Sequence, residues 1–181
     1  LTNQPSSSED LVQLVFYRIL KYRHTYRDEG KFSAWIYHLA RKVAADLTQW
    51  VDKGYDVVAL TPSCALMLKF EWPLLVPKDE NVQRLAKSSH DIAEYIVEIA
   101  KAEGLAPGLQ PMAEPVALHI SCHSRAQNMG FKAADMLRLI PDANVTVLDR
   151  CSGHGGAWGA EKKNFDTALK VGKPEIGRAH V

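Results

Sequence analysis

The sequence predicts an α/β fold in which a pair of helices is followed by a partial, three-stranded parallel sheet with flanking helices. Three short runs rich in valine, isoleucine and leucine predict the strands, and they cover residues 55–60, 116–120 and 145–148. Each run leads into a loop and then into a segment with helical periodicity. The order of strand, loop and helix is typical of parallel sheets.

Two segments before the first strand have the periodicity of amphipathic helices. Apolar residues recur at helical spacing over residues 11–20 and again over residues 32–47. Three serines followed by Glu9 and Asp10 precede the first of these segments. Because hydroxyl groups cap helix N-termini and acidic side chains favour the positive end of the helix dipole, a helix is predicted to begin there.

Later helices are predicted from the same periodicity, over residues 82–102, 125–140 and 157–171. The first of these has a predicted break near residues 88–90, because serine and aspartate are typical capping residues. The last is predicted to end before Gly172 and Pro174, two residues that often follow a helix.

The composition limits the classes of function. Hydrophobic residues make up 46% of the chain and charged residues 24%, as in ordinary globular domains. A net charge of +1 predicts no general attraction to nucleic acid or anionic membranes. No run approaches the roughly 18 apolar residues of a membrane-spanning helix. Three cysteines without a secretion signal indicate reduced thiols and a cytoplasmic location.

Each of the three cysteines follows one of the predicted strands: Cys64, Cys122 and Cys151. In open α/β sheets, ligands bind beyond the carboxyl ends of the strands. The shared position therefore predicts that the three thiolates are metal ligands. Taken singly, each cysteine has the alternative of packing in a core or of being a reactive thiol. No C-x-x-C pair is present, so the spacing does not predict a zinc ribbon.

Residues beside these cysteines are candidates for binding a cofactor. His123 and His154 lie in the cysteine loops and could support or ligate a metal. Arg125 could hold an anionic cluster or substrate, although arginines in loops are usually solvated. Gly153 belongs to a loop with three glycines, which permits close approach of the backbone to a ligand.

The cysteine motifs resemble the cysteine-rich CCG domain of the heterodisulfide reductase family, which includes the iron–sulfur subunits of anaerobic glycerol-3-phosphate dehydrogenases. The motifs are Thr61-Pro-Ser-Cys64, His119-Ile-Ser-Cys122-His123 and Cys151-Ser-Gly-His-Gly-Gly156, within residues 49–174. The resemblance implies an electron-transfer subunit of an oxidoreductase, with an iron–sulfur cluster as cofactor. It also implies a flavin dehydrogenase or other redox subunits as partners, and peripheral membrane association through them. Ser152 stands where the family has a second cysteine, which leaves the ligand set incomplete.

Residues 10–46 resemble region 2 of extracytoplasmic-function sigma factors, and this resemblance supports an alternative function. It implies binding of promoter DNA or RNA polymerase through basic and aromatic residues, here Arg23, Trp35, Arg41 and Lys42. Cations would contact phosphates and aromatic rings would stack on unpaired bases. Sigma factors usually carry asparagine at the position of Lys42.

The two resemblances divide the chain into segments 1–48 and 49–174. Residues 175–181 resemble the translation of a sequencing adapter and are predicted to be a non-native tail. A further alternative is therefore a non-functional fusion fragment. If the chain is such a chimera, residues 8–48 should share no core with the rest.

Overall fold

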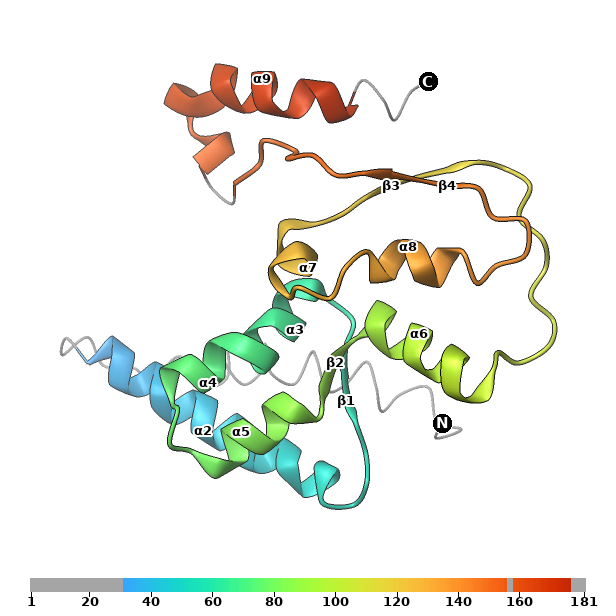
Figure 1. Ribbon diagram of the computed structural model, residues 1–181. Coiled ribbons are helices and arrows are strands. Elements are labelled where there is room, and N and C mark those ends of the chain that lie inside the picture. Colours follow the sequence, from blue (N-terminus) through green and yellow to red (C-terminus); the bar gives the residue numbers. More distant parts are fainter. Residues whose placement is uncertain (1–30, 156–157, 177–181) are drawn as a thin grey trace. The chain divides into compact units, whose positions relative to one another are not determined.

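The computed structural model describes residues 31–155 and 158–176, and the chain divides into two compact units, Leu1–Ile92 and Ala93–Val181 (Figure 1). Both units contain helices and a pair of parallel strands, so the predicted α/β class is confirmed. The predicted helix at residues 11–20, Arg23 and residues 177–181 lie outside the described residues.

The described part of the first unit alternates helices with two short strands. Its elements are α2 (Phe32–Val51), β1 (Val57–Ala59), α3 (Pro62–Leu66), the π-helical turn η2 (Met67–Glu71), α4 (Trp72–Leu75), α5 (Glu80–Lys87) and β2 (Ser89–Asp91). The helix predicted at residues 32–47 is confirmed as α2. Asp79 caps α5, because its Oδ1 accepts a hydrogen bond from the backbone N–H of Val82 at 3.1 Å.

Helix α2 shares a hydrophobic core with the residues that follow it. Its buried residues pack with those of η2, α4 and α5, and the cluster consists of Ala40, Val43, Ala44, Leu47, Leu68, Trp72, Val76, Val82 and Leu85. Ion pairs Arg41–Asp79 and Arg84–Asp52 also join α5 and its cap to α2 and its C-terminal end. The expectation that residues 8–48 share no core with the rest is therefore wrong for α2. The division into segments 1–48 and 49–174 itself stays a prediction.

Strand β1 pairs in parallel with β2, a strand that the sequence pattern did not predict. Val57 lies opposite Ser89 and Ala59 opposite Asp91. Serine, histidine and aspartate have low strand propensity, so residues 88–90 gave only the signal of a helix break. The strand is nevertheless well packed: Ser89 is buried, and its hydroxyl donates to the carbonyl of Leu85 at 2.7 Å.

The second unit begins with α6 (Ile92–Glu103), whose first residue, Ile92, is the last residue of the first unit. Its further elements are β3 (Val116–His119), α7 (Cys122–Ala126), α8 (Lys132–Leu137), β4 (Val145–Leu148), the 3₁₀ turns η3 (Trp158–Ala160) and η4 (Lys162–Asn164), and α9 (Phe165–Ile176).

Strands β3 and β4 lie side by side as a parallel pair (Figure 1). The register pairs Val116 with Val145 and His119 with Leu148. The described residues thus form two sheets of two strands each, in place of the predicted single sheet of three strands. The difference arises because β1 pairs with β2 and not with β3 or β4. The polar sequence of β2 did not predict a strand there.

Two predicted helices differ from the observed ones. The helix predicted at residues 125–140 is split into α7 and α8, and the turn between them contains Asn128 and Gly130 with positive φ. The final helix begins later than predicted and continues to Ile176, with Gly172 and Pro174 inside it. Gly172 is buried in this helix, so its small size is used for packing rather than for ending the helix.

Candidate functional site at the carboxyl ends of β3 and β4

Cys122 and Cys151 occupy equivalent places beyond the ends of two paired strands. His119 lies opposite Leu148 in the register, and each cysteine comes three residues after its member of this pair. Both side chains are exposed. The parallel pairing therefore carries both cysteine loops to the same edge of the sheet, as the sequence predicts for this pair.

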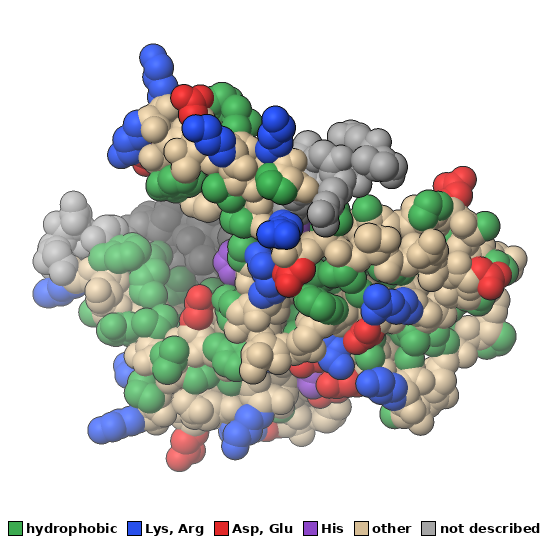
Figure 2. Space-filling model, turned by 45° about the horizontal axis from the view of Figure 1, so that its top comes forward, with side chains coloured by type: hydrophobic (Ala, Val, Ile, Leu, Met, Phe, Trp, Pro, Cys, Tyr) green, Lys and Arg blue, Asp and Glu red, His purple; other side chains and the backbone are tan. Residues whose placement is uncertain are grey.

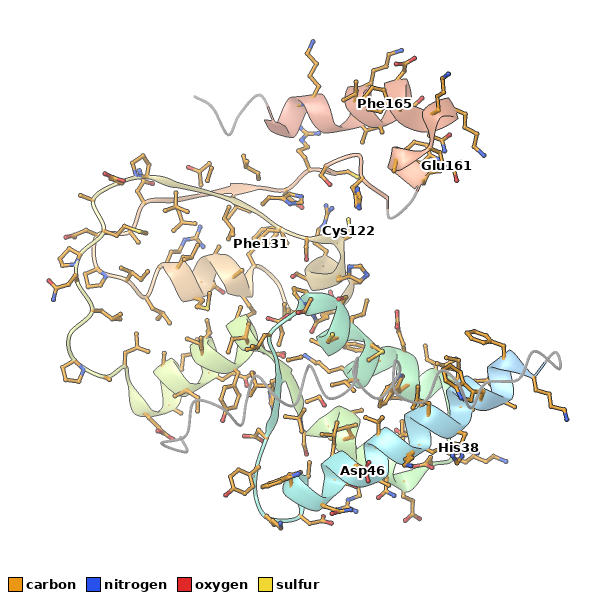
Figure 3. All side chains as sticks on the ribbon, turned by 180° about the vertical axis from the view of Figure 1, so that it is seen from behind. His38, Asp46, Cys122, Phe131, Glu161 and Phe165 are labelled. Carbon is orange, nitrogen blue, oxygen red and sulfur yellow. The ribbon has the colours of Figure 1, made fainter. Side chains whose placement is uncertain are left out.

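Cys122 is the first residue of α7 (Figure 3), and a serine cap sets the start of this helix. The Oγ of Ser121 accepts a hydrogen bond from the backbone N–H of Ser124 at 3.2 Å, and the two hydroxyl groups lie 2.9 Å apart. Because Ser121 is extended and its side chain caps the helix, the chain leaves the strand and begins the helix at Cys122.

The guanidinium of Arg125 links Cys122 to the loop after β4. Its Nη2 donates to the Sγ of Cys122 at 3.6 Å, and its Nη1 donates to the Oδ1 of Asp149 at 2.9 Å. The hydrogen bond to Cys122 raises the pKa of Arg125 above its usual value, and the carboxylate of Asp149 acts in the same direction. A permanent positive charge therefore lies beside the thiol of Cys122.

Two further contacts fix the loop that carries Cys151. The imidazole Nε2 of His119, at the end of β3, donates to the carbonyl of Arg150 at 3.1 Å. The backbone N–H of Gly153 points to the Sγ of Cys151 at 3.4 Å. The loop after β4 is thus connected both to the neighbouring strand and to its own cysteine.

The other predicted site residues lie apart from this network. His123 is exposed on α7, and exposed His154 lines a pocket of about 210 Å³ together with Ser152, Phe165 and Leu169. Cys64 is half-buried on α3 in the first unit. Within residues 31–155 and 158–176, no three side chains of histidine, cysteine, aspartate or glutamate are grouped so that they could hold a metal ion. The predicted ligand set of Cys64, Cys122 and Cys151 stays a prediction.

Sequence reasoning missed two residues of the network, Asp149 and His119. Asp149 is the first residue after β4, at the same sheet edge as the cysteines. No local pattern indicated this ion pair, because its partner Arg125 lies 24 residues earlier in the chain. His119 entered the sequence analysis only as part of a cysteine motif; its side chain is exposed and contacts the carbonyl of Arg150.

The alternative, nucleic-acid-binding residues lie on α2, apart from Arg23. Arg41 and Lys42 are exposed and Trp35 is half-buried, with its ring centroid 5.9 Å from that of Phe32. Arg41 lies 3.6 Å from the carboxylate of Asp79. On the face that Figure 2 shows, Lys and Arg side chains are interspersed with Asp and Glu. The described residues drawn on that face therefore do not form a uniform basic surface of the kind that binds a phosphate backbone.

Comparison with known proteins gives matches to one family and to several individual proteins. The family described as Sigma-70 region 2 matches residues 1–49. An anaerobic glycerol-3-phosphate dehydrogenase subunit, from Escherichia coli K12 and O157:H7, is 30% identical over 124 residues, which cover 67% of this chain and 30% of the relative. Lactate utilization protein A of Bacillus licheniformis is 28% identical over 138 residues, which cover 72% of this chain and 56% of the relative.

Both predicted resemblances are confirmed by these matches. The chain spans less than a third of the length of the Escherichia coli relatives. No solved structure matches the chain. Among the described residues, none of the helices combines the length and the apolar character that a membrane crossing requires.

Proposed function

We propose that residues 49–174 form an electron-transfer module of an oxidoreductase, in which Cys122 and Cys151, with Cys64, are ligands of an iron–sulfur cluster. The observation that carries the proposal is the equivalent placement of Cys122 and Cys151 beyond the paired ends of β3 and β4. The similarity to a dehydrogenase subunit and to a lactate utilization protein supports it.

The chemistry of the side chains fits such a cofactor in part. Thiolates are the usual ligands of iron–sulfur clusters, and a cluster would supply one-electron transfer. Arg125 would offset negative charge on the thiolates, because its guanidinium already contacts Cys122. Ser152 provides only a hydroxyl group, which is a poor ligand for a soft metal centre. We therefore expect the isolated chain to hold a cluster weakly.

The same proposal covers the partners and the location. A module with one cofactor needs an electron donor and an acceptor, and we propose a flavin dehydrogenase or other redox subunits for these roles. Reduced cysteines suit the cytoplasm. Contact with a membrane would then be peripheral and would depend on the partner subunits.

Anaerobic reconstitution with iron and sulfide tests the proposal. We expect thiolate-to-iron charge-transfer absorption in the unmodified chain, and its loss in Cys122→Ala and in Cys151→Ala, because each change removes one of few thiolate ligands. The Arg41→Gln, Lys42→Gln double variant should keep the absorption. If both cysteine variants absorbed as strongly as the unmodified chain, Cys122 and Cys151 would be excluded as ligands.

A second function, sigma-factor-like binding of promoter DNA or RNA polymerase, is favoured by the match of residues 1–49 to Sigma-70 region 2. Binding of single-stranded promoter DNA that weakens steeply with salt, and that depends on Arg41 and Lys42, would support it. We expect this binding to be weak, because the net charge of the chain is +1. A chain with neither activity would correspond to the non-functional fusion fragment.

A further inference from the structure

Gly153 has a backbone conformation and a setting that set it apart in the cysteine loop. Its φ is +77°, a region that L side chains rarely adopt. The residue is buried although its neighbours Ser152 and His154 are exposed. Its N–H lies 3.4 Å from the Sγ of Cys151. Gly153 therefore contacts Cys151 through its N–H and is itself covered by another element of the fold.

The covering element is α9. A Cβ placed on Gly153 would overlap the carbonyl oxygen of Ala168, and it would lie 3.0 Å from the carbonyl carbon of that residue and 3.1 Å from the backbone nitrogen of Gly172. These atoms belong to the backbone of a helix, so they cannot turn aside as the end of a flexible side chain could. Ala168 and Gly172 are both buried small residues, which allows the helix to come this close.

A second close approach supports the same loop. A Cβ on Gly159, in η3, would lie 2.5 Å from the carbonyl oxygen of His154 and 2.6 Å from that of Gly153. The backbone around Gly153 is therefore packed against α9 and against η3, with no room for a side chain at either contact. Such close packing restricts movement of the loop backbone at both contacts.

We propose that α9 is part of the cysteine site and that Gly153 is a positioning residue, which holds Cys151 in place through the contact of its backbone with Ala168 and Gly172. The inference rests on the proposed function, because it assigns Gly153 a role for a thiolate that binds a metal. Outer residues that orient a ligand commonly change metal affinity by about 10- to 100-fold when they are altered.

Gly130 provides a matched control for the strain of a positive φ. Its φ is +73°, close to that of Gly153, but nothing lies within 4 Å of a Cβ placed there. Alanine at either position is strained by its φ, and only at Gly153 does it also meet the backbone of α9. The difference between Gly153→Ala and Gly130→Ala thus isolates the contact with the helix.

Binding of Cd²⁺ to the full, metal-free chain tests the proposal, with thiolate-to-cadmium absorption as the readout. We expect the unmodified chain to bind Cd²⁺ through Cys122 and Cys151. Gly153→Ala should weaken this binding at least about tenfold more than Gly130→Ala does. Equal affinity in the two glycine variants would overturn the role of Gly153 and leave the proposed function standing. A lack of two-thiolate binding in the unmodified chain would overturn both.

A second variant keeps the test decisive if Gly153→Ala does not fold. Ala168→Leu adds bulk on the helix side of the contact and leaves the cysteine loop unchanged, so it should also weaken Cd²⁺ binding. Lys170→Leu, on the exposed face of the same helix, should not. Unchanged affinity in a folded Ala168→Leu variant would contradict the proposal.

Discussion

The two units of the chain are stabilised by different kinds of contact. In the first unit, large side chains such as Leu85, Val82 and Trp72 fill one continuous core between α2, η2, α4 and α5. Among the described residues of the second unit, the buried hydrophobic ones are Ala93, Val97, Ile120, Ala134, Leu148 and Ala168. Three of these six are alanine, so the described part of the second unit buries less large apolar side-chain volume than the core of the first.

The comparison shows where stability and where the candidate site reside. A large apolar core contributes most of the free energy of folding in a small domain. The cysteine loops of the second unit depend instead on specific local contacts: the Ser121 cap, the guanidinium of Arg125 and the close approach of Gly153 to α9. We therefore expect mutations in the first unit to act on stability, and mutations in the second to act on the properties of the thiols.

The largest effect on stability should come from Leu85→Ala. Leu85 is fully buried in the core that α5 shares with α2. Its truncation removes apolar contacts and leaves a cavity, which costs about 2–5 kcal/mol. Chemical denaturation, followed by circular dichroism, measures the loss. Leu74→Ala is the control, because Leu74 is 81% exposed and its truncation should change stability by less than about 0.5 kcal/mol.

This prediction also tests whether α2 and α5 form one core. If Leu85→Ala were no more destabilising than Leu74→Ala, the shared core would not exist in solution. The segments 1–48 and 49–174 would then be independent parts, as the two resemblances first suggested.

A smaller effect is expected from the two helix caps, one in each unit. Asp79→Ala removes the cap of α5 together with the ion pair to Arg41, and Ser121→Ala removes the cap of α7. Each loss should cost about 1 kcal/mol. Hydrogen–deuterium exchange should place the first effect in α2 and α5 and the second around Cys122. Faster exchange throughout both units in either variant would contradict this separation.

The sequence predicted the parts of the fold that have a strong pattern. Strands β3 and β4 follow from runs rich in aliphatic residues, and α2 follows from its apolar periodicity. Strand β2 could not be predicted, because Ser89 and Asp91 are polar and their burial depends on pairing with β1. Gly172 was misinterpreted for a similar reason: only the contact with Gly153 shows why a glycine lies inside α9.

For the candidate site, the sequence predicted positions but not contacts. The strand ends located Cys122 and Cys151, since strand direction and loop length are local properties. Asp149 was missed because its role depends on Arg125, 24 residues earlier in the chain. Contacts of this kind arise from the register of the two strands, which a single sequence pattern does not contain.

The smallest change in stability, and a selective change in the chemistry of the site, should come from Arg125→Gln. The ion pair with Asp149 is partly exposed, so its loss should leave the unfolding midpoint unchanged. The cation beside Cys122 should instead attract negatively charged reagents to that thiol. In Arg125→Gln, the rate of modification of Cys122 by the dianionic disulfide 5,5′-dithiobis(2-nitrobenzoate) should fall. This fall should be about threefold larger than that of the rate with neutral iodoacetamide, as expected from losing one charge a few ångströms away.

Arg138→Gln is the matched control, because Arg138 pairs with Asp135 at 3.4 Å within one helical turn. An equal slowing of both reagents at Cys122, or the same change in Arg138→Gln, would show that Arg125 acts on the structure of α7 and not through its charge.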